Sequence, residues 1–199
     1  MKLPIFALSI VITATPAFAN PCHDRFAELL VPGNQKTGPT RLHITQEIVG
    51  GQTSLNYHYS DGKGNGMTEM IDPADQPMSL FLDDNMYSST DKGKSWSFMN
   101  SYDAKKSLAD MKKNLTNDAA KATGVLCGRE EYKGALHEVV EGNYKSTMVS
   151  GSQIYQKYWI NEQTGLMVKS YSHLKGNGFE SKTTQVIEPY PELKLPNPE

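Results

Sequence analysis

The chain has 199 residues, of which 38% are hydrophobic and 21% charged. This composition is typical of one folded globular domain and excludes a disordered or collagen-like chain. Twenty Lys and Arg residues against 22 Asp and Glu residues give a net charge of −2, which offers no bulk attraction to a phosphate backbone, so we expect no nucleic-acid partner.

The N-terminal segment has the pattern of a secretory signal peptide. Lys2 precedes an apolar stretch over residues 3–14 that is too short to span a bilayer. Ala17 and Ala19 then supply the small-x-small pattern that precedes a cleavage site. We predict that residues 1–19 are removed and that residues 20–199 form a single mature domain.

The mature chain is predicted to be exported without an anchor. No later stretch reaches 18 apolar residues, so we expect no transmembrane segment. Asn20 and Pro21 precede Cys22, whereas a lipidated cysteine would be the first mature residue. Cys22 and Cys127 are the two cysteines, and an oxidising compartment favours a disulfide between them over free thiols. These features predict a soluble periplasmic protein.

The first elements are a short helix and a hairpin. Residues 23–30 have a helical pattern, and from Thr40 the hydrophobic period changes to two. Before the Gly50-Gly51 turn the alternating apolar residues are Leu42, Ile44 and Ile48, and after it they are Leu55, Tyr57 and Tyr59. This alternation predicts a hairpin with one apolar face.

Strand patterns occupy most of the remaining chain, at residues 67–71, 78–83, 85–89, 95–100, 124–132, 135–143, 153–160, 166–173 and 179–187. One amphipathic helix interrupts them over residues 103–123, where Asp103 can cap the N-terminus and Leu108, Met111 and Leu115 form an apolar stripe. The tail over residues 189–199 contains four prolines and should be extended. About ten strands and one inserted helix predict a mainly β fold, with an antiparallel sheet curled around the helix.

No motif indicates catalysis, so we predict that the protein is not an enzyme. Residues 89–96 match an Asp box, but a single copy favours a structural hairpin over a glycosidase. Residues 61–72 resemble a calcium loop, yet Lys63 stands where an oxygen ligand belongs, so we favour a glycine turn. The five histidines show no metal-ligand spacing. We therefore expect no metal and no cofactor.

One late hairpin carries a family resemblance. Residues 158–169 read Tyr-Trp-Ile-Asn-Glu-Gln-Thr-Gly-Leu-Met-Val-Lys, and this segment, together with the order of elements over residues 40–187, resembles the LolA/LolB-like superfamily of envelope proteins. In that superfamily a Trp-hydrophobic-Asp segment is followed by Thr-Gly-Leu-Pro; here Asn161 replaces Asp and Met167 replaces Pro. The resemblance implies a strongly curved antiparallel half-barrel sheet with an apolar concave face beneath a helical lid.

The resemblance also implies that the protein binds lipid or lipoprotein acyl chains, as a carrier or binding protein. An envelope sensor or adapter that binds a protein partner is the alternative, and the opposing interpretation of the apolar residues is a closed core. The residues predicted to contact the ligand are Leu42, Ile44, Ile48, Leu55, Tyr57, Leu80, Leu82, Trp96, Phe98, Leu108, Met111 and Leu115.

Overall fold

The computed structural model describes residues 20–32, 38–176 and 178–198. The predicted signal peptide, residues 1–19, lies outside the described residues. Within them, no helix has the length and apolar character needed to cross a membrane.

The described residues form two helices and eleven strands. The helices are α1 (Pro21–Leu30) and α2 (Ala104–Ala119). The strands are β1 (Thr40–Ile48), β2 (Thr53–Ser60), β3 (Gly66–Asp72), β4 (Met78–Leu82), β5 (Asn85–Ser89), β6 (Ser97–Ser101), β7 (Thr123–Tyr132), β8 (Ala135–Lys145), β9 (Gln153–Asn161), β10 (Met167–Gly176) and β11 (Phe179–Pro189). The predicted strands are therefore confirmed, and α2 ends earlier than the predicted residue 123.

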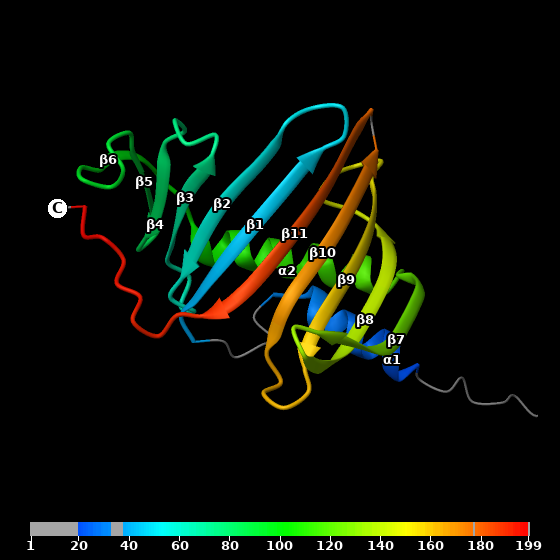
Figure 1. The fold of residues 1–199 in the computed structure, drawn as a ribbon. Helices are drawn as coiled ribbons and strands as arrows, with labels where there is room; N and C mark the ends of the chain where they lie inside the picture. The colour runs from blue at the N-terminus through cyan, green and yellow to red at the C-terminus, as the bar shows by residue number, and fades with distance from the viewer. Residues whose placement is uncertain (1–19, 33–37, 177, 199) are drawn as a thin grey trace, which may run out of the picture.

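All strands belong to one open, curled sheet in the order β6-β5-β4-β3-β2-β1-β11-β10-β9-β8-β7 (Figure 1). Every neighbouring pair is antiparallel, and pairing of β1 with β11 joins the N-terminal and C-terminal meanders. Helix α2 connects the two meanders in sequence. It crosses one side of the sheet, contacting α1 and β8 (Figure 1), and the predicted cap is confirmed because Asp103 Oδ1 accepts a hydrogen bond from Lys106 N at 2.7 Å.

The main hydrophobic core lies between the helices and strands β8 and β9. Phe26 of α1 is fully buried, and its ring centroid lies 6.5 Å from that of Tyr144 and 6.1 Å from that of Tyr158. A Cβ added at Gly142 would lie 3.1 Å from the Phe26 ring, so the glycine provides space for it. We call the sheet face that carries Tyr144 and Tyr158 the inner face, and the opposite one the outer face.

The predicted disulfide is confirmed. Cys22, at the start of α1, is bonded to Cys127 on β7. Cys127 lies directly opposite Val140 of β8, which is fully buried in the core, so the bond attaches α1 to the inner face beside the edge of the sheet.

Buried tyrosines make the fold sensitive to alkaline pH. Burial, followed by the charge of Asp118, raises the pKa of Tyr144 to about 12. The unfolded chain loses this phenol proton with a pKa near 10. The contribution of Tyr144 to the free energy of unfolding is therefore fully present below pH 10 and falls as the pH rises towards 12. In the original protein this loss lowers the free energy of unfolding by up to about 1.4 kcal/mol per pH unit over this window. We expect Tyr144→Phe to remove this decline, as measured by urea unfolding at pH 9 to 11.5. Equal slopes in both proteins would contradict the assignment.

Candidate functional site

Strand β1 places a row of apolar side chains on the inner face. In an antiparallel sheet, directly paired residues share a face. Leu42 is opposite Ile187, and Ile44 is opposite Gln185. Gln185 is opposite Ser170, and Ser170 is opposite Tyr158. Leu42, Ile44 and Ile48 therefore share the inner face with the core, as predicted. All three stay half-buried, because the helices pack on β7 and β8 and do not seal the sheet at β1.

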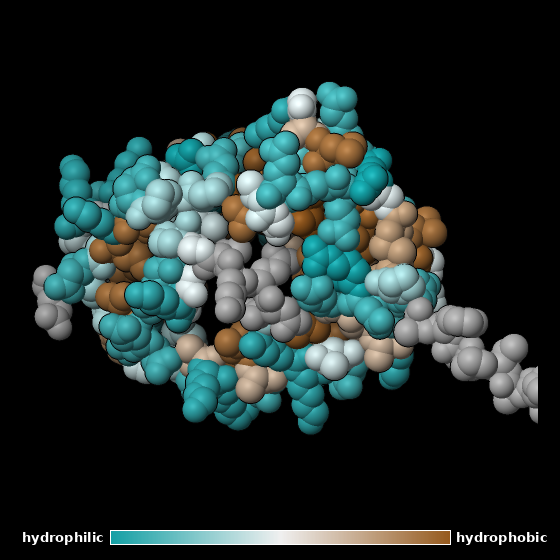
Figure 2. Space-filling view, turned by 90° about the horizontal axis from the view of Figure 1, so that it is seen from below, coloured by the Kyte–Doolittle hydropathy of each residue, from teal (hydrophilic) through white to brown (hydrophobic). Residues whose placement is uncertain are grey.

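An apolar pocket of about 380 Å³ opens at the rim of the sheet where β1 begins and β11 ends. The apolar residues that line it are Pro39, Leu166, Met167, Val168, Ile187, Pro189 and Pro191. Figure 2, the view from below, shows hydrophobic residues exposed in several places between hydrophilic ones. Since Ile187 lines the pocket and pairs with Leu42, the pocket adjoins the apolar row of β1. We call the two together the rim site.

The turn between β9 and β10 forms one wall of the rim site. Asn161 Oδ1 accepts hydrogen bonds from the backbone N–H groups of Gln163 and Thr164, both at 3.0 Å. Gly165 has φ 69°, which favours glycine, and Leu166 N donates to Thr164 Oγ1 at 3.3 Å. This is the hairpin that carries the sequence resemblance. Its turn thus holds Leu166 and Met167 at the pocket, although neither was among the predicted ligand contacts.

The register corrects the predicted face of the second hairpin strand. Leu55 is opposite Thr45 and Tyr57 is opposite His43, so both lie on the outer face, and the expectation of one apolar face on both strands is wrong. Arg41 provides a physical reason, because its guanidinium carbon lies 5.1 Å from the centre of the Tyr57 ring.

The same correction applies to the predicted contacts in β4 to β6. Tyr59 on the outer face of β2 is opposite Met67, and Met67 is opposite Leu80. Leu80 is opposite Tyr87, and Tyr87 is opposite Phe98. This pairing places four predicted contacts with the outer face: Leu80, Leu82, Trp96 and Phe98. Trp96 joins them because a Cβ at Gly93 would touch both Trp96 and Met78, and Met78 lies on the same face of β4 as Leu80. Leu80 is also fully buried, so it is closed to any ligand.

The predicted contacts on α2 differ in their surroundings. Leu115 packs against the main core, and Met111 is half-buried. Leu108, nearer the start of the helix, leaves 41% of its surface exposed. The apolar stripe of α2 is therefore only partly covered, which leaves hydrophobic surface available towards the N-terminal half of the helix.

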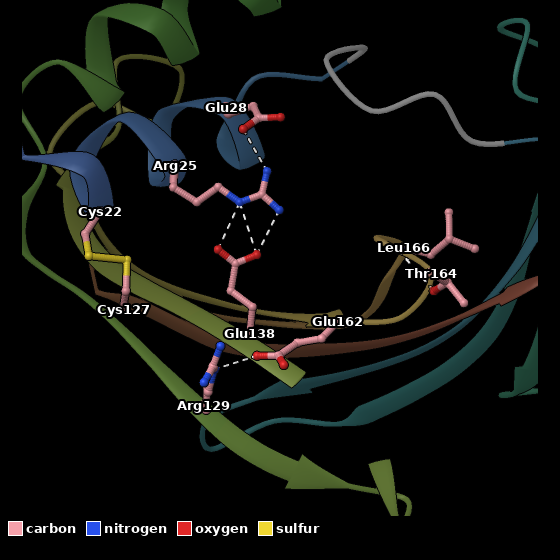
Figure 3. A network of polar contacts seen from close by, with 9 residues as sticks. All are labelled: Cys22, Arg25, Glu28, Cys127, Arg129, Glu138, Glu162, Thr164 and Leu166. Atoms are coloured by element: carbon pink, nitrogen blue, oxygen red, sulfur yellow. Dashed lines mark hydrogen bonds and ion pairs between the residues drawn. A yellow bond between two sulfur atoms is a disulfide. The ribbon is translucent and has the colours of Figure 1, made fainter. Parts of the chain in front are cut away.

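A network of ion pairs holds α1 on β8 (Figure 3). Arg25 Nη2 donates to Glu138 Oε2 at 2.9 Å, and Arg25 Nη1 donates to Glu28 Oε2 at 2.7 Å. The hydrogen bond to Glu138 raises the pKa of Arg25. In the adjoining cavity of about 440 Å³, Arg129 pairs with Glu162 at 2.7 Å. Both guanidinium groups are thus matched by carboxylates, and we assign the network a structural role.

His58 is the inward-facing histidine of β2, because it lies opposite Leu42. Its Nδ1 lies 3.0 Å from Thr68 Oγ1, and burial lowers its pKa. The side chain is therefore neutral at neutral pH. It adds a polar group but no charge to the surface beside the rim site.

The Asp-box turn is held by its own hydrogen bonds. Asp91 Oδ1 accepts from Ser89 Oγ at 2.8 Å and Asp91 Oδ2 from Ser95 Oγ at 2.6 Å. These hydrogen bonds, of which the one from Ser95 has the largest effect, hold the pKa of the Asp91 carboxyl well below its usual range. Asp61 likewise accepts from Lys63 N at 2.7 Å. Among the described residues, no group of three His, Cys, Asp or Glu side chains is arranged to hold a metal.

No protein-family model and no curated protein matches this chain. Solved structures similar to it include a LolA superfamily protein from Nitrosomonas europaea, with 11% identity, a TM-score of 0.34 and coverage of 88% of this chain and 94% of that chain. A second is an outer membrane lipoprotein-sorting protein domain from Vibrio parahaemolyticus, with 11% identity, a TM-score of 0.35 and coverage of 86% and 92%. A third is the MucA/MucB complex of Pseudomonas aeruginosa, with 14% identity and a TM-score of 0.43, where the match covers 85% of this chain but 57% of that chain.

Proposed function

We propose that the protein is a soluble periplasmic carrier or binding protein for an acyl chain, belonging to a lipid or to a lipid-modified partner. The chain would lie on the inner face between β1 and α2, with one end in the rim pocket. The observation that supports this proposal is the rim site itself, an apolar pocket of about 380 Å³ that adjoins the row Leu42, Ile44 and Ile48. Small-molecule sites usually have volumes of about 300 to 1,000 Å³.

Burial of an acyl chain at this site supplies enough free energy for binding. Each methylene group removed from water contributes about 0.8 kcal/mol. A dozen of them therefore contribute roughly 10 kcal/mol before the costs of ordering the chain are subtracted. No charged group is needed for such an affinity, in agreement with a pocket lined mainly by aliphatic and proline side chains.

The proposed compartment rests on two features. The Cys22–Cys127 disulfide is suited to an oxidising environment, and residues 1–19 have the pattern of an export signal. We propose that the mature domain carries its ligand without a catalytic step.

Lipid uptake by the purified protein tests the proposal. Mature protein is stripped of lipid, titrated with a fluorescent fatty acid and examined by native mass spectrometry. We expect saturable binding of one or two chains per molecule. Failure to bind any acyl probe would sink the proposal, and a stoichiometric protein partner recovered from envelope extract with the site empty would favour the adapter alternative instead.

A matched pair of variants locates the bound chain. Ile44→Asn places an amide on the inner face of β1, whereas Leu55→Asn makes a similar change on the outer face. We expect Ile44→Asn to weaken acyl-chain binding by about tenfold to a hundredfold, through lost apolar contact and an amide buried by the ligand. Leu55→Asn should bind like the original protein. Equal weakening by both variants, with equal thermal stability, would contradict the assigned face.

A further inference from the structure

A row of uncharged polar side chains crosses the inner face of the sheet. The pairing of β9 with β10, β10 with β11, β11 with β1 and β1 with β2 places one residue of each strand directly beside the next. We call this row the polar belt, and its members are Gln156, Ser172, Thr183, Gln46 and Ser54. Directly paired side chains of an antiparallel sheet lie roughly 4.5 to 5.5 Å apart at Cβ, so the belt is continuous across five strands.

The hydrogen-bonding groups of four belt residues, Gln46, Ser54, Ser172 and Thr183, are half-buried and available to a ligand, whereas Gln156 is buried. No hydrogen bond joins a belt side chain to another side chain or backbone group among the described residues. The only buried side-chain polar atoms there without a partner belong to Trp96 and Ser152, so no polar atom of the belt is both unpaired and completely shut off from solvent. Amide and hydroxyl groups of this kind both donate and accept hydrogen bonds.

The strand surface around the belt carries no charge. At the inward-facing positions of β1, β2, β3, β9, β10 and β11, the described residues include no Asp, Glu, Lys or Arg. The charges of these strands lie on the outer face, where Glu47 pairs with Lys182 at 3.3 Å and Lys157 with Glu141 at 3.3 Å. A charged ligand group at the belt would therefore lose water without meeting an opposite charge on these strands, which is costly.

The belt lies within reach of the rim site. Gln46 is four residues along β1 from Leu42, a distance of roughly 13 Å in a strand. Ile44, on the same face, lies between them. A ligand that places its chain in the rim pocket and over Leu42 and Ile44 therefore brings its polar end to Gln46 and its direct partner Thr183.

We propose that the polar belt binds the uncharged ester, amide or hydroxyl groups of an acyl ligand, so that the protein selects neutral amphiphiles over anionic and cationic ones. This inference rests on the proposed function and names its ligand class. The rim site provides affinity for the chain, and the belt provides selectivity, because a neutral ester, amide or hydroxyl group forms hydrogen bonds there without the cost of removing an unpaired carboxylate or ammonium group from water.

Three ligands with the same chain length test the selectivity. Monopalmitoylglycerol, palmitate and hexadecyltrimethylammonium are titrated below their critical micelle concentrations against delipidated protein, by displacement of one fluorescent probe. We expect the glyceride to bind at least about tenfold more tightly than either ion. Equal binding of all three overturns the selectivity proposal alone, whereas binding of none overturns the proposed function.

Paired double variants then test the belt itself. Gln46→Leu/Thr183→Val removes two neighbouring belt groups, and Thr45→Val/Thr184→Val alters the directly paired residues on the outer face of the same strands. We expect the belt variant to bind monopalmitoylglycerol about fivefold to tenfold more weakly and to lose most of its preference over palmitate. The outer-face variant should keep the original affinity and preference. An unchanged preference in the folded belt variant would overturn the assignment.

Discussion

Replacing Cys22 and Cys127 together with serine should lower the free energy of unfolding by about 4 to 5 kcal/mol. The bond joins residues separated by 105 positions, and closing so long a loop removes much of the conformational freedom of the unfolded chain. It also holds α1, which carries Phe26 into the core. Denaturant unfolding of both proteins under oxidising conditions measures the difference.

Reduction provides the control for this prediction. The original protein in excess dithiothreitol should have the midpoint of the double serine variant, and dithiothreitol should leave that variant unchanged. A loss below about 1 kcal/mol would contradict the prediction, because it would mean that the cross-link barely restricts the unfolded chain.

Phe26→Ala should lower the free energy of unfolding by about 3 to 5 kcal/mol, the usual cost of truncating a buried phenylalanine. Phe26 is fully buried, contacts Tyr144 and Tyr158, and faces the space left by Gly142. The cavity created by the substitution would lie between α1 and the sheet, which limits collapse of the surrounding structure. Thermal and urea unfolding test this expectation.

Phe98→Ala is the matched control, because it is the same substitution at a residue with 58% of its surface exposed. We expect its effect on stability to stay below about 1 kcal/mol. Phe26→Leu should recover more than half of the loss caused by Phe26→Ala, since it retains much of the buried volume. Equal losses for Phe26→Ala and Phe98→Ala would show that the core does not depend on α1.

Most local elements could be predicted because their signals are local. The alternation of Leu42, Ile44 and Ile48 with polar residues indicates β1 without reference to any other segment. The oxygen of Asp103 at the start of α2 and the glycine in the turn after Asn161 are similarly local signals. Each of these features appears in the structure where the sequence predicts it.

The faces of the strands were harder to predict, because alternation defines two faces but does not say which one is inside. Leu55 and Tyr57 have the same apolar character as Ile44, yet the register with β1 turns them outward. On that side Tyr57 contacts Arg41, and Arg41 pairs with Glu188 at 2.8 Å. An outer face stabilised by aromatic and cationic contacts therefore resembles an inner apolar row in the sequence.

The mainly β character, the order of the elements, the disulfide-forming cysteines and the apolar row of β1 can all be inferred from the sequence without coordinates. Which residues meet depends on the folded chain: Gln46 contributes to the belt beside Thr183 because β1 pairs with β11, and Pro39 reaches Leu166 at the rim pocket. These partners are more than 100 residues apart. Alternation and capping depend on neighbours along the chain, whereas a binding surface depends on strand order and register across the whole sheet.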